Sequence, residues 1–179
     1  MTKLALVPRT VATVNVKNST AKNNVRYFYV FLTEKCSVGV ISNHTAQHIT
    51  LVPPITADEQ IVLDVAKSVA SRFRQFKIRL NGRTMIGPKK DISVIDIRPN
   101  RHLKALHVTL FDELEKQNIN IGYTRYARDE YTPHITIKNY LPAISETKSI
   151  LFDHIAVIHK YKNVKTVLAK CMLAESNEK

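Results

Sequence analysis

Two short segments far apart in the chain repeat the same pattern of residues. HITL at positions 48–51 and HITI at positions 134–137 each place a histidine and a threonine two positions apart, among branched apolar residues. Histidine has an unperturbed pKa near ~6.5, so one imidazole can accept a proton while another donates one. A hydroxyl beside each imidazole can donate a hydrogen bond to a phosphate oxygen. The two segments therefore predict phosphoryl-transfer chemistry that needs no metal. The predicted catalytic residues are His48, Thr50, His134 and Thr136.

The spacing within each segment matters because residues two apart on a β-strand share a face. A strand at each segment would project the histidine and the threonine together and turn Ile49 and Ile135 inward. Any half-exposed strand has such a polar stripe, so one segment alone would mean little. Two copies in the same residue order favour a shared function.

A third tripeptide of the same type, His107-Val108-Thr109, serves as an internal control. It lies in a predicted helix, where residues two apart point about 200° from one another. His107 falls on the apolar stripe of that helix and Thr109 faces away. We therefore predict that His107 is a packed structural histidine.

The charge of the chain favours a polyanionic partner. The formal net charge is +12, and the stretch from Arg72 to Lys104 holds ten lysines and arginines against Asp91 and Asp96. A cluster of this kind is typical of nucleic-acid or nucleotide binding, although a solvated basic surface that aids solubility remains the alternative.

The composition limits the other possibilities. The 179 residues and 44% hydrophobic content suit one domain with a real core. No apolar run approaches the ~18–20 residues of a membrane span, and no signal peptide is evident, so a cytoplasmic protein is expected. Cys36 and Cys171 are expected to be ordinary thiols, and no cysteine or histidine cluster has zinc spacing.

The hydrophobic pattern predicts two helices and several strands. One helix begins at the capping box Thr56-Ala57-Asp58-Glu59 and ends near Gln75, and the other begins at Asn100. Asn81-Gly82 predicts a turn between two strands. Strands are predicted over 26–32, 48–52, 76–80, 83–86, 92–97, 134–139, 150–159 and 163–173. This predicts an α+β fold: two pseudo-symmetric lobes of mainly antiparallel sheet with helices on the outside.

The paired segments resemble the signature of the 2H phosphoesterase superfamily, within it the 2′,3′-cyclic phosphodiesterases also called RNA 2′,5′-ligases. HITL (48–51) and HITI (134–137) match its two His-x-Thr motifs, and FKIRLNGRTMIG (76–87) is similar to its strand-turn-strand segment. The resemblance covers residues 26–173 and predicts a single bilobal domain over 26–179, whereas residues 1–25 form an N-terminal extension of uncertain role. It implies two lobes around a central cleft with one motif on each wall.

The resemblance also implies the reaction: hydrolysis of a cyclic phosphodiester on an RNA end or a small nucleotide, with no cofactor. Which histidine is the base stays open. Lys138 shares the second motif's face and is either a phosphate ligand or a solvated surface lysine. Tyr131 either stacks on a base or packs on the lobe. The alternatives are a phosphodiesterase of 2′,5′-linked or cyclic oligonucleotide signals and a non-catalytic RNA-binding module. A monomer without membrane association is expected.

Overall fold

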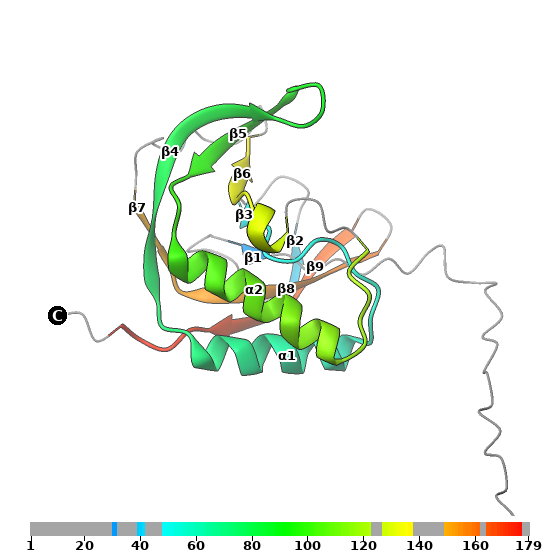
Figure 1. The fold of residues 1–179 in the computed structure, drawn as a ribbon. Coiled ribbons are helices and arrows are strands. Elements are labelled where there is room, and N and C mark those ends of the chain that lie inside the picture. Colours follow the sequence, from blue (N-terminus) through cyan, green and yellow to red (C-terminus); the bar gives the residue numbers. More distant parts are fainter. Residues whose placement is uncertain are drawn as a thin grey trace, which may run out of the picture.

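The computed structural model describes residues 30–31, 39–41, 48–122, 127–137, 149–161 and 164–176 (Figure 1). The predicted N-terminal extension, Cys36 and Lys138 lie outside these ranges. In chain order the elements are β1 (Val30–Phe31), β2 (Gly39–Ile41), β3 (His48–Ile49), α1 (Glu59–Arg72), β4 (Phe76–Ile86), β5 (Ile92–Ile97), α2 (Arg101–Lys116), the 3₁₀ helix η2 (Arg128–Glu130), β6 (His134–Thr136), β7 (Ser149–Phe152), β8 (His154–Tyr161) and β9 (Val164–Met172).

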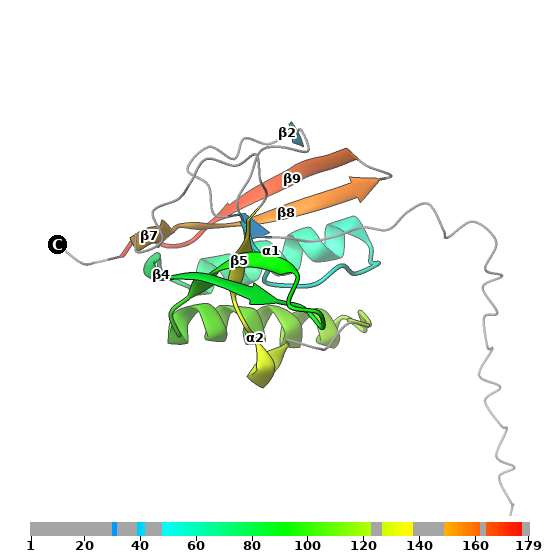
Figure 2. The same ribbon diagram turned by 90° about the horizontal axis from the view of Figure 1, so that it is seen from above.

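The strands form two antiparallel sheets, as the sequence predicts. One has six strands in the order β1-β3-β6-β5-β4-β7, and the other has three in the order β2-β9-β8. The six-stranded sheet is curled, and β4 sweeps round its outer side to the end of α1 (Figure 1). Seen from above, α1 lies between α2 and the strands β8 and β9 (Figure 2). The α+β prediction is confirmed.

Both helices begin at a side-chain cap. Asn100 accepts hydrogen bonds from the backbone N–H groups of His102 and Leu103, which confirms the predicted start of α2. The start of α1 was predicted at Thr56 and is wrong by two residues. Asp58 caps this helix, because its carboxylate accepts from the N–H groups of Gln60 (2.8 Å) and Ile61 (3.3 Å).

The helices and both sheets enclose the main core. The apolar stripe of α2 is buried, with Leu103, Leu106 and Phe111 fully so. It packs in one cluster with Ile49 and Ile135 from the two motif strands. Burial of these side chains fixes which face of each motif strand points inward. The side chains that alternate with them must therefore point to the opposite face.

The predicted turn at Asn81-Gly82 is wrong, because β4 runs through it as one strand. Gly82 adopts φ +87°, and the pairing of β4 with β5 shifts by one residue between Leu80 and Arg83. This is a β-bulge, which uses the same conformational freedom of glycine that a tight turn would. The chain reverses later, around Gly87, where φ is +94°.

The strand predicted over 150–159 is in fact two strands that belong to different sheets. β7 pairs with β4, and β8 pairs with β9. The chain changes partner at Asp153, which the alternation of side chains alone cannot reveal. Cys171 is a free, buried thiol in β9, as expected. None of the helices in the described part of the chain is long and apolar enough to cross a bilayer.

Candidate active site

The two motif strands lie side by side in the interior of the larger sheet. β3 pairs antiparallel with β6, with Ile49 opposite Ile135. This register places His48 opposite Thr136 and Thr50 opposite His134. Since Ile49 and Ile135 are 0% and 1% exposed on the core side, the four polar residues share the other face. Each is half-buried there.

The register brings the two histidines together as diagonal neighbours. Residues in this relation on adjacent strands lie about 7–8 Å apart, so imidazoles from both strands can reach a single phosphate placed above the pair. Each histidine also has a threonine from the other motif directly opposite it. The antiparallel pairing thus creates a local two-fold arrangement in which the motifs contribute equivalent groups.

The ring of His134 is oriented by its own backbone. Its Nδ1 lies 2.9 Å from the carbonyl oxygen of Thr132. A carbonyl can only accept, so Nδ1 carries the proton. The remaining nitrogen, Nε2, is therefore the atom available for proton transfer, as base when neutral and as acid when protonated.

The neighbouring strand adds a carboxylate on the same face. β5 pairs with β6 so that Asp96 lies opposite His134. The Asp96 carboxylate accepts a hydrogen bond of 2.9 Å from the side-chain amide of Asn81, which stands at the bulge of β4. Sequence reasoning missed Asp96 because only strand order and register place it beside the second motif.

Tyr131 connects the approach to the second motif with the end of the first. Its hydroxyl donates a 3.0 Å hydrogen bond to the carbonyl oxygen of Thr50. Burial raises the pKa of Tyr131 above its ordinary value, so the phenol stays a donor. One face of its ring stacks on His107. This geometry corresponds to the packed alternative for Tyr131, and a base could stack only on the ring's other face. Base stacking stays a prediction, as does the role of Lys138.

His107 holds the same two segments together from α2. Its Nδ1–H donates to the carbonyl oxygen of Leu51 over 2.6 Å, and its Nε2 accepts from the backbone N–H of Arg128 over 2.8 Å. Burial lowers the pKa of His107 to about 4, against the opposing effect of the Leu51 carbonyl. The imidazole is thus neutral at pH 7, and the prediction of a packed structural histidine is confirmed.

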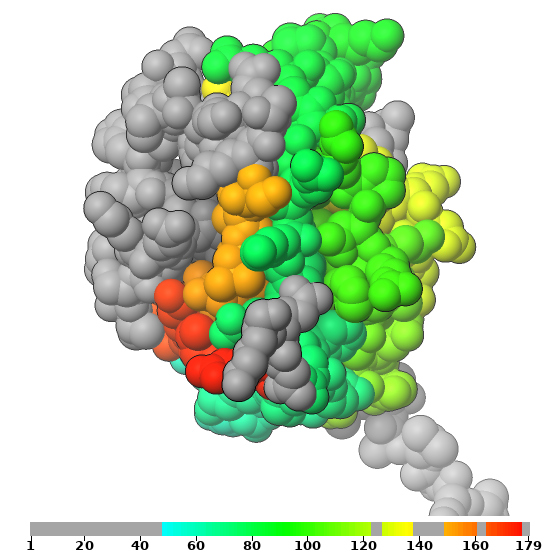
Figure 3. All heavy atoms as spheres, turned by 90° about the vertical axis from the view of Figure 1, so that its left-hand side faces the viewer, coloured from blue at the N-terminus to red at the C-terminus, as the bar shows by residue number. Residues whose placement is uncertain are grey.

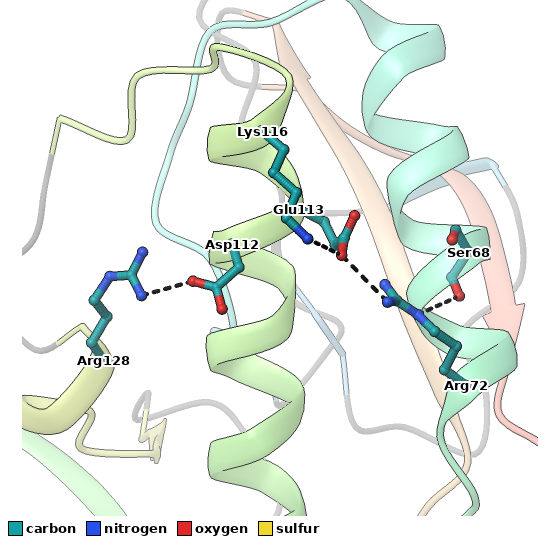
Figure 4. Close-up of polar contacts among 6 residues, drawn as sticks. All are labelled: Ser68, Arg72, Asp112, Glu113, Lys116 and Arg128. Atoms are coloured by element: carbon teal, nitrogen blue, oxygen red, sulfur yellow. Dashed lines mark hydrogen bonds and ion pairs between the residues drawn. The ribbon is translucent and has the colours of Figure 1, made fainter.

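Arg128 anchors the segment before the second motif to the polar side of α2. Its guanidinium contacts Asp112 at 2.8 Å and Glu115 at 2.6 Å, and the first of these contacts is drawn in Figure 4. The backbone of Arg128 has φ +55°, a conformation that non-glycine residues seldom adopt. The two carboxylates and the bond to His107 hold it there.

The described residues provide no evident metal centre. Within the described ranges, no three histidine, cysteine, aspartate or glutamate side chains are grouped in a way that could hold a metal ion. The chemistry available at this site from the described residues is proton transfer by imidazole and hydrogen bonding by hydroxyl.

The protein belongs to the 2′-5′ RNA ligase superfamily. The model of this superfamily matches residues 38–158, which include both motifs and more than half of the chain. This confirms the resemblance to 2H phosphoesterases and supports a phosphoesterase activity in general. No functionally curated protein matches the sequence.

Solved structures share the fold at low sequence identity. A protein described as a phosphoesterase is 14% identical, with a TM-score of 0.58 over 86% of this chain and 99% of its own. The protein TT0787 of Thermus thermophilus is 19% identical, with a TM-score of 0.55 over 86% and 100%. Escherichia coli LigT complexed with 3′-AMP is 12% identical, with a TM-score of 0.55 over 86% and 99%.

Proposed function

We propose that the protein is a metal-independent phosphodiesterase that hydrolyses 2′,3′-cyclic phosphodiesters on RNA ends or small nucleotides. The proposal depends mainly on the register of β3 and β6, which sets two His-Thr pairs on one sheet face. Superfamily membership gives it a second, independent support. LigT, which shares the fold, has been crystallised with 3′-AMP, a nucleotide that carries a ribose phosphate.

The reaction would use the two imidazoles in turn. One Nε2 removes a proton from water as the water oxygen attacks phosphorus. The second imidazole, protonated, gives its proton to the ribose oxygen as the bond from that oxygen to phosphorus breaks. The ring opens to a phosphate monoester and a free hydroxyl. A placed acid or base is typically worth ~10²–10⁴ in rate.

The threonines would stabilise the charge that develops on the non-bridging oxygens. Thr50 and Thr136 lie on the same face as the imidazoles, and their hydroxyls can donate to those oxygens. Because the arrangement is close to two-fold symmetric, either histidine can serve as base, and their roles exchange when the reaction reverses.

The test is hydrolysis of 2′,3′-cyclic AMP by the wild type and by the variants His48→Ala, His134→Ala and the double variant, with and without chelator. Each single change should remove turnover, and the double variant should lose no more, because the two act as a unit. Full activity in either single variant would disprove the assignment.

Two outcomes would point to the alternatives. Tight RNA binding without turnover would favour the non-catalytic module. Turnover of 2′,5′-linked or cyclic oligonucleotides, but not of 2′,3′-cyclic ends, would favour a nucleotide-signal phosphodiesterase. Phosphorus NMR of the product identifies which ribose oxygen keeps the phosphate.

A further inference from the structure

A row of cations continues from the candidate active site across the same sheet face. In β4, Lys77 and Arg79 are exposed and alternate with the buried Ile78 and Leu80. Just beyond β5, Arg98 is exposed and follows the buried Ile97. Since the buried residues point to the core, these three cations point to the face that carries the motif histidines.

The row contains two arginines directly opposite each other. Leu80 pairs with Ile97, so the next pair outward is Arg79 and Arg98, and the Arg98 N–H donates to the Arg79 carbonyl oxygen over 2.9 Å. Like charges in this position destabilise an antiparallel pair. On the other side of β4, the β7 residues that face Lys77 and Arg79 are the uncharged Leu151 and Ser149.

Four cations of the helical side form salt bridges, in contrast to this row. Arg72 and Lys116 share Glu113, at 3.3 and 3.0 Å, and Arg128 contacts Asp112 (Figure 4). Lys104 pairs with Asp129 at 3.0 Å. Within the described part of the chain, no carboxylate forms a salt bridge with any of the three cations of the row, which are Lys77, Arg79 and Arg98.

One residue, Asp96, separates the row from the candidate site on the same face. Asp96 lies opposite His134, and Arg98 is two positions further along the same face. From Arg98 the row crosses to Arg79 and Lys77 and reaches β7, where Leu151 is 49% exposed. Figure 3 shows this side of the molecule, with β7 in orange beside β4 in green.

We propose that this row binds the sugar-phosphate backbone of single-stranded RNA, whose 3′ end reaches the two His-x-Thr pairs. The position of the RNA end rests on the proposed function, whereas backbone binding does not. A line of cations that form no salt bridge with the described residues complements a chain of phosphates, and the exposed Leu151 offers an apolar contact to a sugar or base. The substrate would then be an oligonucleotide, with contacts several nucleotides from the reacting phosphate.

The test measures binding alone, with no chemical step. Fluorescence anisotropy is recorded with a single-stranded RNA of about twelve nucleotides that ends in ordinary hydroxyls, a length within the range of known single-strand sites. The row variant Lys77→Gln/Arg79→Gln/Arg98→Gln is compared with Arg72→Gln/Lys104→Gln/Lys116→Gln. Both lose three positive charges, but the second loses them from the helical side, where each of the three cations forms a salt bridge.

We expect the row variant to bind RNA about tenfold or more weakly at low salt, and the control variant to bind as the wild type does. Three lost phosphate contacts should reduce the slope of log K against log salt by about 2. Equal losses in both variants would show general charge attraction and overturn the proposal, as would unchanged binding by the row variant.

Failure of this test is distinct from failure of the proposed function. A protein without hydrolytic activity could still bind RNA along the row. An active enzyme could hydrolyse its substrate without any contact between RNA and the row. If the triple variant does not fold, Arg98→Gln alone gives the comparison with Lys116→Gln, since it removes a like-charge contact. A slope lower by about 0.7 is then expected only for Arg98→Gln, and equal slopes would overturn the proposal.

Discussion

The phenol ring of Tyr131 lies flat on the imidazole of His107, with 3.8 Å between the ring centroids and 4° between the planes. Each ring also bonds the first motif segment, Tyr131 at the carbonyl of Thr50 and His107 at the carbonyl of Leu51. The pair therefore ties the end of the first motif to the segment that leads into the second. Neither residue has to touch substrate to set the relative position of the motifs.

Tyr131→Phe removes the hydroxyl bond to Thr50 and keeps the ring stack. We expect a loss of about 1 kcal/mol in the free energy of unfolding, since one partly buried hydrogen bond disappears. If the bond positions the first motif, kcat for 2′,3′-cyclic AMP falls while KM changes little. Urea denaturation and steady-state kinetics measure the two effects. Unchanged kcat in a destabilised variant would limit Tyr131 to a structural role.

The stability of the protein should depend on pH through His107. Its pKa is about 4 in the folded protein against 6.5 as the ordinary value, so between these values the unfolded state binds more protons. The free energy of unfolding then rises with pH across this window, and stability present above pH 6.5 is lost toward pH 4. The contribution of this group is roughly 3 kcal/mol.

His107→Gln tests whether His107 causes the pH dependence of stability, because glutamine can donate and accept hydrogen bonds but does not titrate. Urea denaturation at several pH values should give a flatter dependence than in the wild type. Part of the dependence remains, since burial also lowers the pKa of His154. Superimposable pH profiles for variant and wild type would rule out His107 as the source.

The motif threonines should be needed for turnover more than for stability. Thr50→Val and Thr136→Val each remove a hydroxyl proposed to stabilise the transition state, and a single such donor is typically worth ~10²–10³ in kcat. Thr109→Val is the matched control, since Thr109 belongs to the third His-x-Thr tripeptide, in α2. Comparable losses at all three positions would contradict the assignment.

The bulge in β4 should depend on the backbone freedom of Gly82. Its φ is +87°, and a Cβ there would meet nothing within 4 Å. Gly82→Ala should therefore lower the free energy of unfolding by about 1 kcal/mol through backbone strain alone. Gly122→Ala is the control, with equally open space and no positive φ. Equal thermal midpoints for the two variants would argue against strain at the bulge.

The cap of α1 distinguishes two candidate residues that look equivalent in sequence. Asp58→Ala should cost about 1 kcal/mol, because two backbone N–H groups lose their acceptor. Thr56→Ala should change the thermal midpoint little, since Thr56 is exposed two residues before the cap. A lower thermal midpoint for Thr56→Ala than for Asp58→Ala would show that Thr56 is the cap.

The local sequence pattern was sufficient to predict structural features that depend on a single strand or helix. The alternation of HITL and HITI predicts which side chains share a face, and the burial of Ile49 and Ile135 agrees. The helical period around His107 predicts a packed histidine, and its burial confirms this. Asn81-Gly82 correctly indicated a positive φ at the glycine. It did not distinguish a turn from a β-bulge, because both need the same backbone freedom.

The sequence by itself determined the superfamily, the antiparallel α+β class and the two His-Thr pairs as candidates, because spacing and alternation are local properties. Only the tertiary structure decided that β3 and β6 are neighbours in register, that Asp96 lies opposite His134 and that His107 bonds both the first motif and the segment before the second. The row of Lys77, Arg79 and Arg98 also emerges only from the fold, since the sequence does not show which cations form salt bridges. Partners across a sheet are chosen by burial and hydrogen bonding among residues far apart in the chain, and no local pattern encodes that choice.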